Sequence, residues 1–294
     1  MIVGVVLVNL ISILGYMNRL TWIARPLILI GHLHPESGLS FITAFASPTA
    51  ANTMLMDLYQ KGIITKRELF IASMSNSFPA ILVHWRSMLP VLIPLLGHVG
   101  VIYFLLLVFV GLIKTALVLI VGHFILPFQS VQLTLFKKEP KPPLPDAFKQ
   151  SLQKSIPMFK RIIFITIPIT IITFYLLHLH FFDYLSNWLS PILHFLPLPP
   201  EALSIIAAQF AGHLPAYTLA SNLLVAHVLT GKEIILALLV GTVLTSITGL
   251  RYLIPYYWGI FGPKLGTQIM LVSQGLRQSI ILLIAIGVYW WPFN

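Results

Sequence analysis

Cysteine is absent from the 294-residue sequence, and charged residues make up only 9% of it. The absence of cysteine excludes disulfides, thiolate metal sites, iron–sulfur clusters and cysteine nucleophiles. A soluble domain carries about 25% charged residues, and a disordered chain needs high charge with low hydrophobicity. Here 57% of the residues are hydrophobic and the mean hydropathy is +0.92. Because a spanning helix needs about 20 apolar residues, the composition predicts an all-α polytopic membrane protein with about 8–10 membrane segments.

Enzyme motifs are also missing. The sequence contains no P-loop, no GxSxG and no HExxH motif. The pairs His32/His34 and His178/His180 lie at expected span ends with no carboxylate cluster beside them, and alternate residues do not share a helix face. Interfacial packing is therefore a better interpretation of these histidines than a metal site. We expect no catalytic residues, no cofactor and no bound metal.

Positive charge is in excess, with 18 Lys and Arg against 8 Asp and Glu, a net charge of +10. In a membrane protein such an excess fixes the orientation of loops rather than binding nucleic acid. One proline-rich stretch is especially basic and is predicted to be a cytoplasmic linker, 130–165, that ends in an amphipathic surface helix. Its cations are Lys137, Lys138, Lys141, Lys149, Lys154, Lys160 and Arg161.

The two halves of the chain align without gaps at an offset of 165 residues. The pairs that match across this offset include Pro35 with Pro200, Glu36 with Glu201, Glu68 with Glu233, Arg86 with Arg251, Pro90 with Pro255 and Gly97 with Gly262. This alignment predicts two homologous helical repeats, 1–129 and 166–294, joined by the linker 130–165. Each repeat is expected to open with an apolar helix (2–17 and 162–178) and to close with a long one (99–125 and 264–290).

The charges of equivalent loops favour inverted repeats. The loop 18–35 holds Arg19 and Arg25, whereas its equivalent, 178–200, holds no Lys or Arg. Five crossings per repeat, with the N-terminus outside and the linker inside, place both loops according to the positive-inside rule. The turn with Lys61, Lys66 and Arg67 would then lie outside, against that rule.

Arg86 and Arg251 are the first candidate site residues. Each lies in an apolar stretch, four residues before a proline and eleven before a glycine. An arginine at mid-membrane costs about 3 kcal/mol on insertion scales and marks a functional site by default. A shared anion site explains the repetition, and an arginine that snorkels from a helix end is the alternative.

Two interrupted helices, 36–60 and 201–226, supply the next candidates. Proline follows Ser47 in the first and His213-Leu214 in the second. Freed backbone groups survive in a membrane only where they are buried in protein or line a cavity, and matching interruptions in two halves indicate a transporter's binding site. A plain proline kink is the alternative. The candidate residues at these interruptions are Pro48, Thr49, Asn52, Gln209, His213 and Tyr217, and the last three are expected to share one helix face.

A polar run follows each interrupted helix. The first run includes Asn76, and the second includes Thr245 and Ser246. These side chains could bind a solute through hydrogen bonds, or they could be small residues that allow helices to approach closely. The sequence leaves both interpretations open.

Several segments resemble motifs of the nucleoside-recognition or Gate domain family. The helix break of that family resembles Ala46-Ser47-Pro48-Thr49-Ala50 and Ala211–Ala216, and its later motif resembles Asn76–Pro79 and the segments after Arg86 and Arg251. That family includes spore maturation proteins A and B and the Gate halves of the ferrous iron transporter B. The resemblance implies broken helices around a central site. The iron transporter's motifs carry cysteine and follow a GTPase domain, so the chain departs from them and iron transport is not expected.

These observations predict a multi-pass transporter of the cell membrane for a small anionic or polar solute, nucleoside-like or phosphate-bearing. Alternating access would come from movement of one repeat against the other. A non-transporting scaffold or assembly subunit, or a lipid-phosphate translocase, are the alternatives. The expected partners are the lipid bilayer and the solute, with a second copy of the chain or a related membrane subunit as further options, and no nucleic acid.

Overall fold

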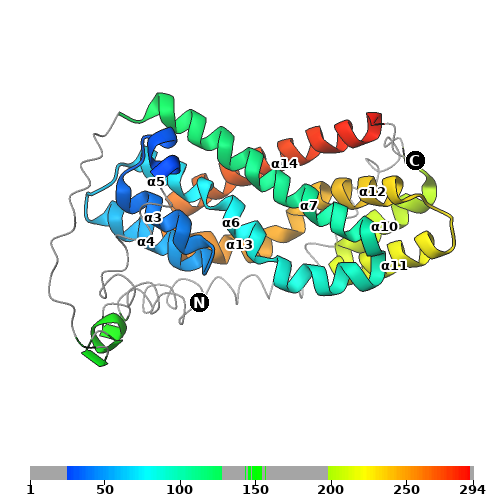
Figure 1. Ribbon diagram of the computed structural model, residues 1–294, viewed down its shortest axis with the longest axis horizontal. Helices are drawn as coiled ribbons and strands as arrows, with labels where there is room; N and C mark the ends of the chain where they lie inside the picture. The colour runs from blue at the N-terminus through cyan, green and yellow to red at the C-terminus, as the bar shows by residue number, and fades with distance from the viewer. Residues whose placement is uncertain are drawn as a thin grey trace. The chain divides into compact units, whose positions relative to one another are not determined.

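The computed structural model describes residues 25–127 and 198–291, together with 143, 145, 146, 148–153 and 156. Of the described residues, 87% are helical and none lies in a strand (Figure 1). The all-α class predicted from composition is therefore confirmed. The expected helices 2–17 and 162–178, and most of the linker 130–165, lie outside the described residues.

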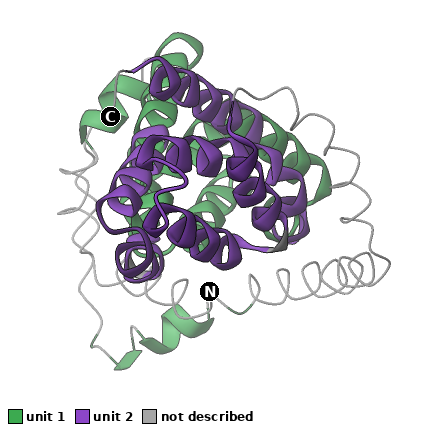
Figure 2. Cartoon of the chain, turned by 90° about the vertical axis from the view of Figure 1, so that its right-hand side faces the viewer, with its two compact units in different colours: residues 1–83, 111–167, 256–273 green, residues 84–110, 168–255, 274–294 purple. Residues whose placement is uncertain are grey.

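Figure 2 divides the chain into two compact units, each assembled from several segments. Of the described residues, unit 1 contains 25–83, 111–127 and 256–273, and unit 2 contains 84–110, 198–255 and 274–291. When the segments of unit 1 are moved by 165 positions, they become 190–248, 276–292 and 91–108, which fall almost entirely in the segments of unit 2. Each unit therefore draws on both halves of the sequence.

Unit 1 is built around the hairpin of α3 and α4, on which α5 and α6 pack (Figure 1). Its complete helices are α3 (Pro35–Ala44), α4 (Pro48–Gln60), α5 (Lys66–Ser75) and α6 (Ser77–Val83). The unit also takes the second part of α7 (Trp85–Ile125), the end of α13 (Ser246–Phe261) and the start of α14 (Pro263–Trp290). Fully buried Leu55 and Leu69 belong to its core.

Unit 2 has the corresponding arrangement around α10 (Pro200–Ala211), α11 (His213–Val225) and α12 (Gly231–Leu244). α10 packs against both α11 and α12. The unit is completed by the first part of α7, most of α13 and the end of α14. Ile205, Ile206, Ile234 and Leu238 are fully buried in its core.

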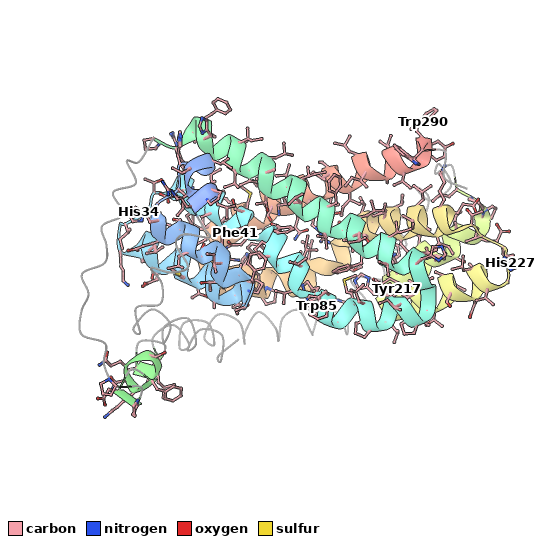
Figure 3. The ribbon with its side chains drawn as sticks, in the orientation of Figure 1. His34, Phe41, Trp85, Tyr217, His227 and Trp290 are labelled. Atoms are coloured by element: carbon pink, nitrogen blue, oxygen red, sulfur yellow. The ribbon has the colours of Figure 1, made fainter. Side chains whose placement is uncertain are left out.

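The starts of three helices recur at the offset of the sequence alignment. α3, α4 and α5 begin at residues 35, 48 and 66, and α10, α11 and α12 begin at 200, 213 and 231. The turn after α4 has a left-handed residue at Gly62 (φ 71°), and the turn after α11 has one at His227 (φ 54°), again 165 residues later. Figure 3 labels His227 in this turn.

Capping groups explain why α5 and α12 begin where they do. The hydroxyl of Thr230 accepts from the Glu233 N–H, and the Glu233 carboxylate accepts in return from the Thr230 N–H. This is a complete capping box, which satisfies two donors at the helix start. Thr65 caps α5 in the same way through the Glu68 N–H. The Glu68 carboxylate instead accepts from the His34 N–H and the Ser37 hydroxyl, and it thereby ties α5 to the start of α3.

Two described helices are long and apolar enough to cross a membrane, Ser87–Ile125 and Pro263–Trp290. A third span arises if α12 and α13, which meet at a bend of 51°, count as one. Both long helices carry exposed apolar side chains, such as Phe124 (80% exposed) and Trp290 (77% exposed). Figure 3 labels Trp290. Exposed apolar surface of this kind marks membrane contact. The total of 8–10 segments remains a prediction, because this search covers only the described residues.

Two glycines with positive φ separate short proline-containing helices from the long ones. Gly97 (φ 54°) divides α7, and Gly262 (φ 79°) lies between α13 and α14. α13 begins at Ser246 and continues through Pro255. A proline inside a helix removes one donor and bends the helix, but here it does not end it.

Replacement of Gly97 by alanine should destabilise the protein through the backbone alone. A Cβ at this position would meet nothing within 4 Å, so only the left-handed conformation is penalised, by about 1–2 kcal/mol. We expect thermal unfolding in detergent to shift down by several degrees. Gly249→Ala is the control, because Gly249 also has open space but lies within α13 without a positive φ. Equal shifts for the two variants would contradict the strain explanation.

Candidate functional site

The interruption between α3 and α4 is a capped helix start. Ser47 has an extended backbone, and its hydroxyl accepts from the Ala50 N–H at 3.2 Å. Pro48 occupies the first position of α4, where a missing N–H removes no intrahelical bond. The predicted break is therefore present, and proline begins the second helix instead of kinking a continuous one.

The interruption between α10 and α11 differs from the first. Gly212 joins the two helices with φ 151° and ψ 166°, a conformation that side-chain-bearing residues rarely adopt. No side chain caps the start of α11. The prediction that Gln209, His213 and Tyr217 share one helix face was wrong, because Gly212 places Gln209 on α10 and the other two on α11. Those two do lie together, with ring centroids 6.1 Å apart.

A chain of buried amides follows the interruption in unit 1. Asn76, between α5 and α6, donates from Nδ2 to Asn52 Oδ1 at 3.1 Å. Asn52 in turn donates from Nδ2 to the hydroxyl of Tyr256 at 2.9 Å. Asn52 and Asn76 are 6% and 2% exposed. The structure therefore brings together two predicted site residues and adds Tyr256, which the sequence pattern did not single out.

Lys114 supplies a buried positive charge to the same unit. This residue of α7 is 3% exposed, and its Nζ donates to Ser273 Oγ at 2.6 Å. The Tyr257 hydroxyl lies 3.5 Å from the same serine oxygen. The neighbouring Thr115 accepts from the Phe78 N–H and donates to the Ser75 carbonyl. Lys114 therefore does not snorkel, and its ammonium belongs to the interior of unit 1.

Unit 2 contains a second polar cluster, formed around Tyr103 of α7. The Tyr103 hydroxyl lies 3.0 Å from Thr242 Oγ1 on α12, and its ring packs edge-on against Tyr217. Figure 3 labels Tyr217 on α11. His213 and Tyr217, predicted from the interruption, lie beside each other, and Tyr217 contacts a tyrosine from the long helix α7.

The hydroxyls of the polar runs mostly bond to their own helices. Thr245 donates to the Gly241 carbonyl at 2.7 Å, as Ser75 does to the Ile71 carbonyl at 2.8 Å. Ser246 is the first residue of α13. The Thr49 carbonyl accepts a hydrogen bond from the Thr53 hydroxyl. Back-bonding of this kind occupies the hydroxyl and often accompanies a helix bend. These contacts favour a local structural role for Thr245, which lies at the bend between α12 and α13.

Both arginines of the repeated pair lie in helices. Arg86 is the second residue of α7, and Arg251 lies inside α13. The Arg251 guanidinium lies over the Tyr252 ring at 4.8 Å, and its Nε is buried without a partner among the described residues. A cation over an aromatic face gains about 0.5–1 kcal/mol where it is exposed. Arg251 is therefore half-buried and only partly satisfied within unit 2.

Histidine and carboxylate groups form no metal site in the described part of the chain, where no cluster of three such residues occurs. His34 accepts from the Glu36 N–H at the start of α3. His32 lies 3.2 Å from the Leu126 carbonyl and packs on His123. His178 and His180 lie outside the described residues.

Comparison with known proteins identifies relatives along nearly the whole chain. Uncharacterized protein MJ1556 of Methanocaldococcus jannaschii is 35% identical over 289 residues, which cover 97% of this chain and 91% of the relative. The chain belongs to the same family as MJ1556. MJ0871 and MJ0880 of that organism are 30% and 23% identical over 286 residues, which cover 97% and 96% of this chain and 89% and 92% of those proteins. No model of a protein family matches the chain, and no solved structure matches it.

Removal of the Tyr256 hydroxyl should destabilise unit 1. In Tyr256→Phe, the Asn52 amide loses its acceptor, and a buried donor without a partner costs about 1–3 kcal/mol. We expect the thermal unfolding midpoint in detergent to fall by several degrees. Tyr252→Phe, at a tyrosine that is 68% exposed, should leave it unchanged. A midpoint that is the same in both variants would show that the Asn52–Tyr256 bond is not part of the stable fold.

Proposed function

We propose that this chain is a membrane transporter for a small polar or anionic solute. The observation that carries the proposal is that each unit combines an interrupted helix with buried polar side chains beside the interruption. In unit 1 these are Asn52 and Asn76, and in unit 2 they are Gln209 and Tyr217. Polar groups at membrane depth are expensive and mark functional sites. Interrupted helices at matching positions in two halves are typical of substrate sites in secondary transporters.

The two halves are proposed to be inverted repeats. The recurrence of helix starts at an offset of 165 residues supports duplication, and so does the way each unit draws segments from both halves. The contrast between Arg19 and Arg25 in one loop and no cation in 178–200 supports opposite orientations. In this arrangement alternating access arises when one repeat moves against the other. The resemblance to Gate domains agrees with this proposal.

Positive charge favours a solute that is anionic or strongly polar. Unit 1 holds the ammonium of Lys114 in its interior, and unit 2 contains the half-buried Arg277 of α14. The buried carboxylate of Glu68 already accepts hydrogen bonds from the His34 N–H and the Ser37 hydroxyl at the start of α3. Nucleoside-like and phosphate-bearing solutes are anionic or strongly polar and therefore match this charge. The groups in these clusters do not indicate a catalytic role.

Uptake into proteoliposomes tests the proposal, with uridine, uridine monophosphate and inorganic phosphate as probes. We expect at least one probe to accumulate, and Arg251→Gln and Arg86→Gln to reduce its uptake by about tenfold, because the proposed anion site would lose a charged partner of the solute, which costs over 1.4 kcal/mol. Lys61→Gln is the control, because Lys61 is exposed and forms an ion pair with Asp57, one helical turn earlier.

Three other outcomes have clear meanings. Uptake that is unchanged in both arginine variants would contradict the proposal that Arg86 and Arg251 form an anion site. Failure of the wild type to transport any of the three probes would contradict the proposed solute class and favour a scaffold. Movement of a fluorescent phospholipid between leaflets, without solute uptake, would favour a lipid translocase.

A further inference from the structure

Among the described residues, three amide oxygens are buried without a hydrogen-bond donor: Asn76 Oδ1, Gln209 Oε1 and Gln278 Oε1. Gln278 is half-buried, whereas the other two side chains are almost fully buried, one in each unit. Asn76 is 2% exposed and Gln209 is 3% exposed. Their NH2 groups are engaged, Asn76 with Asn52 Oδ1 and Gln209 with the Leu238 carbonyl. Among the residues that the structure describes, no donor reaches Asn76 Oδ1 or Gln209 Oε1. More than nine in ten buried polar groups in proteins do have partners, so these two exceptions require an explanation.

The two amides occupy equivalent places although they come from non-equivalent residues. The residue 165 positions after Asn76 is Gly241, which has no side chain. A Cβ on Gly241 would lie 2.5 Å from Gln209 Oε1 and 2.7 Å from its Cδ. The Gln209 amide therefore fills the space that a side chain at 241 would need. Conversely, the residue 165 positions before Gln209 is Ala44, which is fully buried and carries only a methyl group.

Both units therefore contain a side-chain amide at this place, but a different residue of the repeat carries it in each unit. Ala44 and Asn76 form the pair in unit 1, and Gln209 and Gly241 form the pair in unit 2. A group needed only to fill space could have been replaced by an apolar side chain, which avoids the penalty of an unsatisfied acceptor. The retention of an amide with an open carbonyl in both units indicates that the carbonyl itself is used.

We propose that Asn76 and Gln209 each accept a hydrogen bond from an N–H or O–H group of the transported solute. This inference rests on the proposed function and narrows its substrate class to solutes that carry hydrogen-bond donors. A metal cation is disfavoured, because unit 1 buries the positive charge of Lys114 and unit 2 contains the half-buried Arg277. The ligand is therefore a polar molecule with donors of its own, such as the N–H of a nucleobase.

The stability of Gln209→Met without solute gives the first test. Methionine has a similar shape and removes the unsatisfied oxygen. The Leu238 carbonyl still accepts from Thr242 Oγ1 at 2.8 Å, so no new unpaired group arises. We expect the unfolding midpoint in detergent to stay the same or rise by about 2 °C. Thr53→Val, which removes a buried hydroxyl bonded to its own helix, is the matched control. A clear fall in Gln209→Met alone would overturn the inference, because the amide would then hold the fold together.

Exchange of the pair gives the second test. Gly241→Asn should unfold at lower temperature, because its side chain would collide with the Gln209 amide. The double variant Gln209→Ala with Gly241→Asn recreates the arrangement of unit 1. It should recover both the stability lost in Gly241→Asn and the probe uptake lost in Gln209→Ala. A double variant that is as stable as the wild type but no more active than Gln209→Ala would show that the two positions are not interchangeable.

Uptake of uridine and 3-methyluridine, which lacks the base N–H, closes the test. We expect wild-type protein to take up uridine about tenfold faster, since an analogue without the donor leaves buried acceptors unpaired, and Gln209→Met to lose this preference. Equal uptake of both compounds, or an unchanged preference in Gln209→Met, would overturn the inference while leaving the transporter proposal intact. If the wild type takes up neither compound nor the other probes, the transporter proposal fails instead, and the stability tests still decide whether the amides serve the fold.

Discussion

Backbone N–H and C=O groups cannot remain unsatisfied in hydrocarbon, and this constraint determines where the helices of this protein are allowed to stop. Each interruption uses a residue that makes the stop tolerable. Ser47 caps the start of α4, and Pro48 stands where no N–H is required. Gly212 supplies a backbone conformation that other residues rarely adopt. Gly97 and Gly262 do the same at the turns before the long helices. Once helix ends are placed inside the protein, nearby polar side chains can serve a ligand.

Local chemistry made much of the fold predictable from the sequence. Thr65 with Glu68 and Thr230 with Glu233 are capping patterns that can be read directly, and both interruptions and both long helices lie where they were expected. The contacts across the sequence could not be predicted. Nothing in the local pattern pairs Asn52 with Tyr256, 204 residues away, or Lys114 with Ser273. The prediction that Gln209, His213 and Tyr217 share one helix face was wrong, because Gly212 breaks the helix between Gln209 and the other two.

Divergence between the units adds information that neither unit holds by itself. Asn52 of unit 1 corresponds to Tyr217 of unit 2, so hydrogen bonding through an amide has been exchanged for contact between tyrosine rings. The unsatisfied amide carbonyl, in contrast, is kept in both units by different residues. Agreement of the two units in this one group is expected if each unit uses its carbonyl to accept a hydrogen bond from a ligand. The family shared with MJ1556 offers further chains in which this exchange can be examined.

Topology is the most direct test of the account, because inverted repeats place equivalent residues on opposite sides of the membrane. Lys61 and Ala226 are 165 residues apart, both are exposed, and each follows the last residue of its helix. The chain has no cysteine, so Lys61→Cys and Ala226→Cys each carry a single thiol that a membrane-impermeant maleimide can label. The account predicts that intact cells label Lys61→Cys but not Ala226→Cys, and that permeabilised cells label both. Labelling of both variants in intact cells would contradict it.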